Sequence, residues 1–224
     1  MSVLGEFRPR KNVTKIDHKI MYGSIIEPHS KPWIVGLASK KDGRIKCGGV
    51  LIGSKNVLTA AHCMRGSRRK RYVVVGEHDQ ANENDGQLYL PIENYYIHPE
   101  IAKQKGIASF DLAMIRVTNE ISLNSKVAIA QLPNKNDSCE NHSVNVSGWG
   151  IYMPLDRRLS SDQLRTVELT CLPRKFCNAD EYSSYFDYDT MICGGDLKYP
   201  KKGACMGDSG GMFNIEISQK SLRF

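Results

Sequence analysis

Ser209 lies in a stretch, Gly207–Gly211, whose composition suits nucleophilic catalysis. A serine hydroxyl is a poor nucleophile and reacts only when a neighbouring base removes its proton. The glycines on either side let the backbone come close to a substrate and aim N–H groups at a developing oxyanion. The same five residues could also form an ordinary turn. A catalytic role therefore requires a base and an orienting acid elsewhere in the chain.

A histidine and an aspartate precede this serine in contexts of their own. His62 lies in Thr-Ala-Ala-His-Cys (Thr59–Cys63), and Asp111 lies in Phe-Asp-Leu-Ala-Met-Ile (Phe110–Ile115). In the order His, Asp, Ser, the three contexts resemble the trypsin/chymotrypsin family of serine endopeptidases. The resemblance implies that Ser209 attacks a peptide carbonyl while His62 accepts its proton and then passes it to the leaving amine. Asp111 would hold the imidazole in the right tautomer and stabilise its charged form.

The resemblance implies further roles in the residues around the serine. The backbone N–H groups of Gly207 and Ser209 would form the oxyanion hole, where losing one donor typically costs about 10²–10³ in rate. A specificity pocket would bind the substrate side chain that precedes the cleaved bond. Its base falls at Gly203, and Ala204 follows. A preference for Lys or Arg needs a carboxylate at that base. We therefore predict an uncharged pocket that favours apolar or aromatic side chains.

Residues 1–19 are predicted, by the same resemblance, to be a propeptide-like segment. They are polar and show no periodicity, and Lys19 is followed by Ile-Met-Tyr-Gly, beginning at Ile20. Cleavage after Lys19 would free the ammonium group of Ile20 to pair with the carboxylate of Asp208. Removing one partner of such a buried pair typically costs about 3–5 kcal/mol. The alternative is that Lys19 and Ile20 simply mark the end of a linker.

Residues 20–224 are predicted to form an all-β protease domain. Short runs of β-branched and apolar residues alternate with Gly-, Asn- and Asp-containing turns, which predicts antiparallel strands that close into a barrel. The resemblance implies two six-stranded antiparallel barrels, at about 30–130 and about 140–224. The second is expected to be incomplete, because family members continue with further strands and a terminal helix. The strand-like runs of the first half are Trp33–Leu37, Gly49–Ile52, Asn56–Thr59, Tyr72–Val75, Gln87–Leu90 and Asp111–Val117.

Seven cysteines without a Cys-x-x-Cys pair favour disulfides over metal binding. They indicate an oxidising compartment, so we expect a secreted, extracellular or granule-stored protein. The resemblance pairs Cys47 with Cys63 and Cys177 with Cys193. An odd count leaves at least one cysteine without an intramolecular partner. Three cysteines have no assigned partner at this point: Cys139, Cys171 and Cys205.

Two charged loops are candidate binding sites, although their sequence signal is less specific than that of the catalytic residues. The net charge is +7, and a basic cluster at Arg65–Arg71 follows His62 closely. Such a loop could bind acidic substrate segments, heparin-like polymers or inhibitors, or it could be solvated surface. The loop from Glu77 to Asp85 carries several carboxylates that could supply some of the six to eight oxygens that calcium takes. The hydrolysis itself needs no metal and no organic cofactor.

We therefore expect a monomeric serine endopeptidase that acts on protein or peptide substrates after an activating protease has cut it. Protease inhibitors are possible further partners, and neither nucleic acid nor a membrane is expected. The sequence contains no continuous run of about 18 apolar residues, the length that a membrane-spanning helix needs. The alternative is a catalytically inactive, truncated homologue that binds partners or inhibitors. A third hypothesis, a binding module for anionic polymers, needs only the cluster at Arg65–Arg71.

Overall fold

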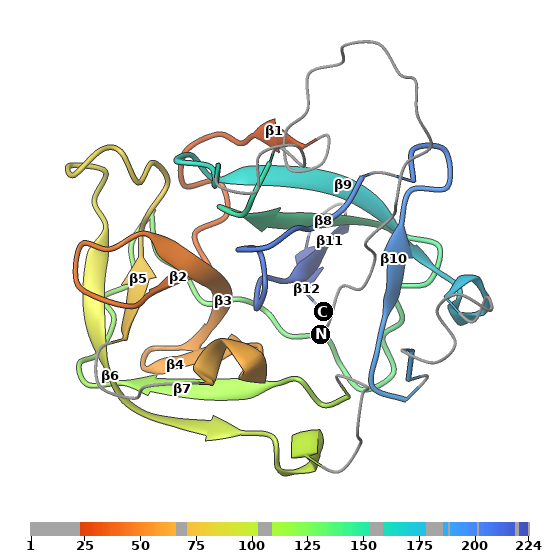
Figure 1. The fold of residues 1–224 in the computed structure, drawn as a ribbon, viewed down its shortest axis with the longest axis horizontal. Coiled ribbons are helices and arrows are strands. Elements are labelled where there is room, and N and C mark those ends of the chain that lie inside the picture. The colour runs from red at the N-terminus through yellow and green to blue at the C-terminus, as the bar shows by residue number, and fades with distance from the viewer. Residues whose placement is uncertain are drawn as a thin grey trace.

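Two β-rich lobes make up the described part of the chain (Figure 1). The computed structural model describes residues 23–65, 71–102, 109–152, 159–177, 186–187, 189–200, 202–217 and 220–223. Lys19, Ile20 and most of the basic cluster at Arg65–Arg71 lie outside these ranges. Within them, no helix is long and apolar enough to cross a membrane.

The first lobe is a closed antiparallel barrel in the strand order β2-β3-β4-β7-β6-β5. Closure pairs every strand on both sides and so leaves no open sheet edge. This lobe confirms the predicted all-β class. Its strands are β2 (Ile34–Ala38), β3 (Ile45–Gly53), β4 (Asn56–Thr59), β5 (Tyr72–Val75), β6 (Leu88–Ile97) and β7 (Ala113–Val117).

Alternating burial along the strands builds the core of this barrel. In β7, Ala113, Ile115 and Val117 are buried while Met114 and Arg116 face solvent. This is the period of two expected of a strand with one face in a core. The inward-facing side chains of the other strands complete one apolar cluster. The barrel is therefore a rigid support for the residues at its ends.

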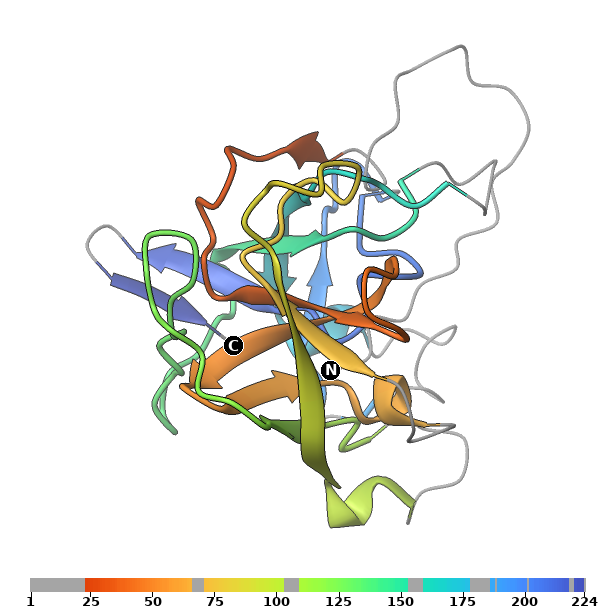
Figure 2. The ribbon, with the colours of Figure 1, turned by 90° about the vertical axis from the view of Figure 1, so that its left-hand side faces the viewer.

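The second lobe is an antiparallel sheet in the order β1-β9-β8-β11-β12, with β10 also paired to β9. It does not close into a barrel within the described residues, which agrees with the predicted incomplete second barrel. The hairpin of β11 and β12 forms one edge of this sheet (Figure 2). The strands are β1 (Ser24–Ile25), β8 (Ser143–Gly148), β9 (Arg165–Leu172), β10 (Cys193–Gly195), β11 (Phe213–Ile217) and β12 (Lys220–Arg223).

In the described ranges, three short 3-10 helices interrupt the strands: η1 (Ala61–Met64), η2 (Pro99–Ala102) and η3 (Arg174–Phe176). The residue pattern predicts only strands and turns at these positions, so these helices were not predicted. Segments of three or four residues are too short to show a helical period. The most consequential is η1, because it carries His62.

Three disulfides join described residues. Cys47–Cys63 and Cys177–Cys193 are the two pairs that the resemblance implied. The third, Cys139–Cys171, joins the segment before β8 to the end of β9 and resolves two of the cysteines left open. Antiparallel pairing of β8 and β9 brings these two cysteines together, because Ser143 is opposite Thr170. Cys205 remains a thiol.

Candidate active site

His62 and Asp111 are brought together by two neighbouring strands of the first barrel. The antiparallel pair β4 and β7 places Thr59 opposite Ala113, so the segments that carry His62 and Asp111 leave the barrel at the same end. The buried Asp111 carboxylate accepts two hydrogen bonds from His62. The backbone N–H donates to Oδ1 at 2.8 Å, and Nδ1 lies 2.5 Å from Oδ2.

These contacts determine the charge of Asp111 and the tautomer of His62. Burial by itself would raise the pKa of the Asp111 carboxyl, but the hydrogen bonds from the His62 side chain and backbone outweigh it, and the pKa falls below its ordinary value. Asp111 is therefore ionised at neutral pH. An ionised carboxylate keeps the proton on Nδ1 and leaves Nε2 of the neutral ring as a proton acceptor.

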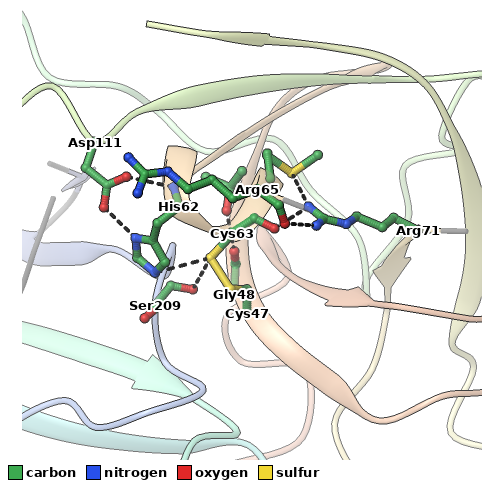
Figure 3. Close-up of a disulfide and its surroundings, with 10 residues drawn as sticks. Cys47, Gly48, His62, Cys63, Arg65, Arg71, Asp111 and Ser209 are labelled. Carbon is green, nitrogen blue, oxygen red and sulfur yellow. Dashed lines mark hydrogen bonds and ion pairs between the residues drawn. A yellow bond between two sulfur atoms is a disulfide. The ribbon is translucent and has the colours of Figure 1, made fainter. Parts of the chain in front are cut away.

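Ser209 is contributed by the second lobe and is held against the first. The backbone N–H of Gly48, on β3, donates to the carbonyl oxygen of Ser209 at 2.7 Å. A Cβ on Gly48 would lie 3.0 Å from the backbone nitrogen of Gly211, so a side chain there would push this loop back by a few tenths of an ångström. Figure 3 shows Ser209 beside the ring of His62 and the Cys47–Cys63 disulfide.

The hydroxyl of Ser209 does not donate to His62 in this structure. Among the described residues, His62 Nε2 instead lies 3.7 Å from Cys63 Sγ. The structure thus brings Asp111, His62 and Ser209 to one place and forms the first of the two hydrogen bonds that a triad needs. In structures without substrate, the bond between nucleophile and base is often long or poorly aligned.

The backbone donors next to Ser209 are available to a substrate. Neither the Gly207 N–H nor the Ser209 N–H donates to a protein acceptor within the described ranges. Gly207 has a φ of 101°, a conformation that side chains disfavour, and a Cβ there would lie 2.8 Å from Gly150 Cα. The loop therefore has the open donors that an oxyanion hole needs.

Asp208 is buried behind this loop. Its carboxylate accepts from the backbone N–H of Gly150 at 2.8 Å and from that of Cys205 at 2.9 Å. Burial outweighs these two hydrogen bonds and raises the pKa of the Asp208 carboxyl to about 6. No cationic side chain pairs with Asp208 in the described ranges, and Ile20, its expected partner, lies outside them.

The expected specificity residues Gly203 and Ala204 are half-buried, and Ala204 packs against the core of the second lobe. A Cβ on Gly203 would meet no atom within 4 Å, so there is space in front of it. The nearest acid before it in the sequence, Asp196, pairs with Lys202 at 2.9 Å. This acid is therefore already neutralised by a lysine, and no atom of a described carboxylate lies within 4 Å of the Cβ position at Gly203.

The loop from Glu77 to Asp85 fits a cation only in part. Burial, followed by the charge of Asp85, raises the pKa of the Glu77 carboxyl to about 7, and Glu77 Oε1 has no hydrogen-bond partner among the described atoms. Asp85 Oδ2, however, already accepts the backbone N–H groups of His78 and Asp79. Glu77 and Asp85 carry four carboxylate oxygens between them, fewer than the six to eight that calcium takes. A calcium site here stays a prediction.

The residues that hold the Asp111 loop were not found by sequence reasoning. Phe110 has a φ of 54°, which is unusual for a bulky residue, and its ring stacks on His98 with 4.7 Å between centroids. Just before it, the buried Ser109 donates to Asp187 of the second lobe at 2.7 Å. Neither contact has a sequence signal, because both partners are distant in the chain. Together they fix the backbone immediately before Asp111.

Known proteins match the chain over most of its length. The sequence model of the family described as Trypsin matches residues 20–215. Granzyme B of Rattus norvegicus is 34% identical over 196 residues, which cover 86% of this chain and 75% of granzyme B. Ovochymase of Halocynthia roretzi is 27% identical over 204 residues, but the chain spans only 13% of ovochymase.

A solved structure has the same fold. It is neuropsin, a serine protease expressed in the limbic system of mouse brain, with a TM-score of 0.73 and 28% sequence identity. The match covers 87% of this chain and 85% of neuropsin.

Proposed function

The chain belongs to the trypsin family of serine proteases, and from that premise we propose that it is an endopeptidase acting through Ser209, His62 and Asp111. The observation that carries the proposal is the ionised, buried Asp111 bound to His62, with Ser209 beside the ring. Ser209 Oγ bonds to the substrate carbonyl carbon as its proton moves to His62 Nε2. The N–H groups of Gly207 and Ser209 hold the oxyanion.

The reaction then passes through an acyl-enzyme, which is formed in one stage and hydrolysed in a second. His62 gives its proton to the leaving amine, the C–N bond breaks, and an acyl group remains on Ser209. Water, deprotonated by the same imidazole, attacks the carbonyl carbon of this ester, the bond from that carbon to Ser209 Oγ breaks, and His62 returns the proton to Oγ as the carboxylic acid product leaves. Asp111 stays ionised throughout and stabilises the imidazolium. Each step uses only side-chain and backbone groups of the chain.

A phosphonate probe that reacts with activated serines tests this function directly. Protein cut after Lys19 is expected to label at Ser209 and to hydrolyse a peptide substrate. The alternative, an inactive homologue that binds partners or inhibitors, has one observation in its favour: the second sheet does not close within the described residues. Absence of labelling in folded, cut protein would establish that alternative.

We further propose that residues 1–19 are a propeptide, that residues 20–224 are the protease domain, and that cleavage after Lys19 activates it. Support comes from Asp208, whose buried carboxylate has two N–H donors and no cation among described residues. Because the pKa of this carboxyl is raised in the folded state, its ionisation lowers the free energy of unfolding as the pH rises from about 4 through 6. An ammonium group at Ile20 would remove that penalty and anchor the loop.

Cleavage after Lys19 is therefore expected to stabilise the fold at neutral pH. A shift of roughly two pKa units corresponds to about 3 kcal/mol, or a rise in Tm of roughly 6–10 °C for a domain of this size. Calorimetry of cut and uncut protein at about pH 7.5 and about pH 4.5 measures this difference in Tm. The rise in Tm on cleavage should be smaller at the lower pH. Asp208→Asn is the control. An equal rise in that variant would show that Asp208 is not the partner.

We propose that the pocket at Gly203 accepts apolar or aromatic side chains. The space in front of Gly203 and the ion pair that neutralises Asp196 support this preference. Gly203→Asp is expected to shift the ratio of kcat/KM for Arg over Phe substrates by about 10²-fold or more, because it adds the missing counter-charge. Gly203→Asn, which has the same size without charge, should leave the ratio near its starting value. Faster cleavage of Arg than Phe by the unaltered enzyme would contradict the assignment.

We also propose that protein or peptide substrates, an activating protease and protease inhibitors are the partners of this chain, as a monomer. Three disulfides among described residues support an oxidising compartment, and thus secretion or storage in granules.

A further inference from the structure

The Cys47–Cys63 disulfide marks the leaving-group side of the proposed active site. His62 must deliver its proton from Nε2 to the leaving amine, so the part of a substrate that follows the cut passes this nitrogen. Cys63 Sγ lies 3.7 Å from His62 Nε2 and 3.6 Å from the carbonyl oxygen of Ser209 (Figure 3). Residues after the cut are therefore led across the disulfide, toward the chain on either side of it.

Lys46 immediately precedes this disulfide on β3, two residues before the glycine that holds the catalytic loop. A β-bulge sets it apart, because Cys47 is opposite Leu37 of β2 and Ile45 is opposite Ala38, so that Lys46 has no partner on β2. The N–H of Gly48 donates to the carbonyl oxygen of Ser209, and a Cβ on Gly48 would be 3.0 Å from the backbone of Gly211, so Lys46 lies next to the part of β3 that contacts the catalytic loop. Lys46 is exposed, and within the described residues no carboxylate forms an ion pair with it.

Two more lysines extend this positive surface. Lys40 and Lys41 are exposed in the turn between β2 and β3. Ala38, which ends β2, is opposite Ile45 of β3 on one side and Tyr72 of β5 on the other. The turn therefore lies beside the start of β5, at the same end of the barrel as Lys46. Neither lysine has an ion-pair partner in the part of the chain that the structure describes.

Arg65 completes the surface on the other side of the disulfide. It is exposed and follows η1 directly, two residues after Cys63. The guanidinium of Arg71 donates to the carbonyl oxygens of both Cys63 and Arg65, which holds this backbone next to the disulfide. Like Lys46, Arg65 has no ion pair among the described side chains.

Few acidic side chains lie near these lysines and Arg65 in the sequence, so positive charge is in excess on this surface. Arg44 is already neutralised, because it pairs with Asp162 at 2.6 Å and also contacts Ser160. Asp42 is the only acid between residues 39 and 46 of the sequence. The surface formed by the four unpaired cations, called here the basic rim, therefore presents a positive field at the leaving-group side. The basic rim consists of Lys40, Lys41, Lys46 and Arg65.

We propose that the basic rim selects protein substrates with acidic residues directly after the cut. An extended peptide advances roughly 3.3 Å per residue, and Lys46 lies two residues along β3 from Gly48. The second and third residues after the cut are therefore within reach of Lys46, and later ones reach the rest of the rim. This preference rests on the proposed protease function, and it acts independently of the pocket at Gly203.

The size of the effect follows from the exposure of the rim. Each exposed charge pair changes affinity only about 2- to 5-fold, because water screens it. A peptide with three acidic residues after the cut is expected to have a kcat/KM roughly 10- to 30-fold above that of its basic twin. The preference should fall toward unity in about 0.5 M NaCl, where the screening length is only a few ångströms.

The test compares matched substrates with the cut, full chain. Two peptides share every residue before the cut and carry Ala-Glu-Asp-Glu or Ala-Lys-Arg-Lys after it, and a fluorogenic amide carries no residue after it. Lys46→Glu is expected to lower the acidic-to-basic ratio at least 5-fold while hydrolysis of the amide changes less than twofold. Lys55→Glu, the same charge reversal just beyond the opposite end of β3, should leave the ratio unchanged.

The outcomes separate this preference from the proposed function. Normal hydrolysis of the amide with equal cleavage of both peptides would overturn the role of the rim and leave the protease assignment intact. If the amide is not hydrolysed, fluorescence anisotropy with Ser209→Ala decides. Binding of the labelled acidic peptide about 10-fold tighter than its basic twin supports the rim. Equal binding of the peptides, with retention on heparin lost in Lys46→Glu, would assign it to sulfated polysaccharide and overturn the proposal.

Discussion

Ser209→Ala is expected to lower kcat of the cut protein by about 10⁶-fold, the typical loss when a triad serine is removed. The alanine has no oxygen that can attack the carbonyl, so only the oxyanion donors and substrate binding remain. Folding should be unaffected. The Ser209 hydroxyl makes no hydrogen bond among the described residues, and the bond that anchors this residue uses its backbone carbonyl, held by Gly48.

Hydrolysis of the fluorogenic amide and thermal unfolding, measured on the same preparation, test both parts of this expectation. Tm should stay within about 1 °C of the unaltered protein. Ser125→Ala, at an exposed serine, is the matched control and should retain full activity. Residual activity above about 1% in Ser209→Ala, after contamination has been excluded with a phosphonate probe, would mean that another group is the nucleophile.

Asp111→Asn is expected to lower kcat by about 10⁴-fold with the fold retained. The amide oxygen can replace Oδ1 as acceptor for the backbone N–H of His62, which leaves the NH₂ group facing Nδ1. Two donors cannot share that position. The imidazole must therefore accept at Nδ1 and carry its proton on Nε2, where it can no longer take the proton of Ser209.

The pH dependence of stability distinguishes this cause from simple misfolding. Because the folded pKa of Asp111 is lowered, its carboxylate stabilises the native state above the ordinary pKa, and this contribution is lost as pH falls through the folded pKa. The asparagine variant should lose less stability than the unaltered protein between about pH 5 and pH 3. Asp42→Asn, at an exposed turn, serves as control. A loss of activity with altered near-UV circular dichroism would instead indicate a disrupted site.

Local patterns in the sequence were enough to predict the all-β class and the strands of the first barrel. Alternating burial, as in β7, reflects a period that each strand carries in its own residues. The runs Tyr72–Val75 and Asn56–Thr59 became β5 and β4 without change. The run Gln87–Leu90 was too short, because β6 continues to Ile97 through residues with little apolar alternation. Pairing with β5 and β7 extends it, and pairing is not local.

The features that the sequence did not predict are either too short to show a period or depend on contacts between residues that are apart in the chain. His62 lies in a 3-10 helix too short for periodicity, and Cys139 meets Cys171 only because β8 and β9 pair. The strained Phe110 is held by its stack on His98 and by the contact that Ser109 makes to the other lobe. No window of neighbouring residues contains these partners.

The sequence by itself determined which chemical groups are present: a serine between glycines, a histidine, an aspartate, and strands to carry them. Only the tertiary structure decided their state. A pKa follows from burial and from hydrogen-bond partners, and these come from segments 49 residues apart for Asp111 and 58 apart for Asp208. Likewise, the sequence shows Lys46 only as one more lysine, and the packing of Gly48 against Gly211 places it two residues from the contact with the catalytic loop.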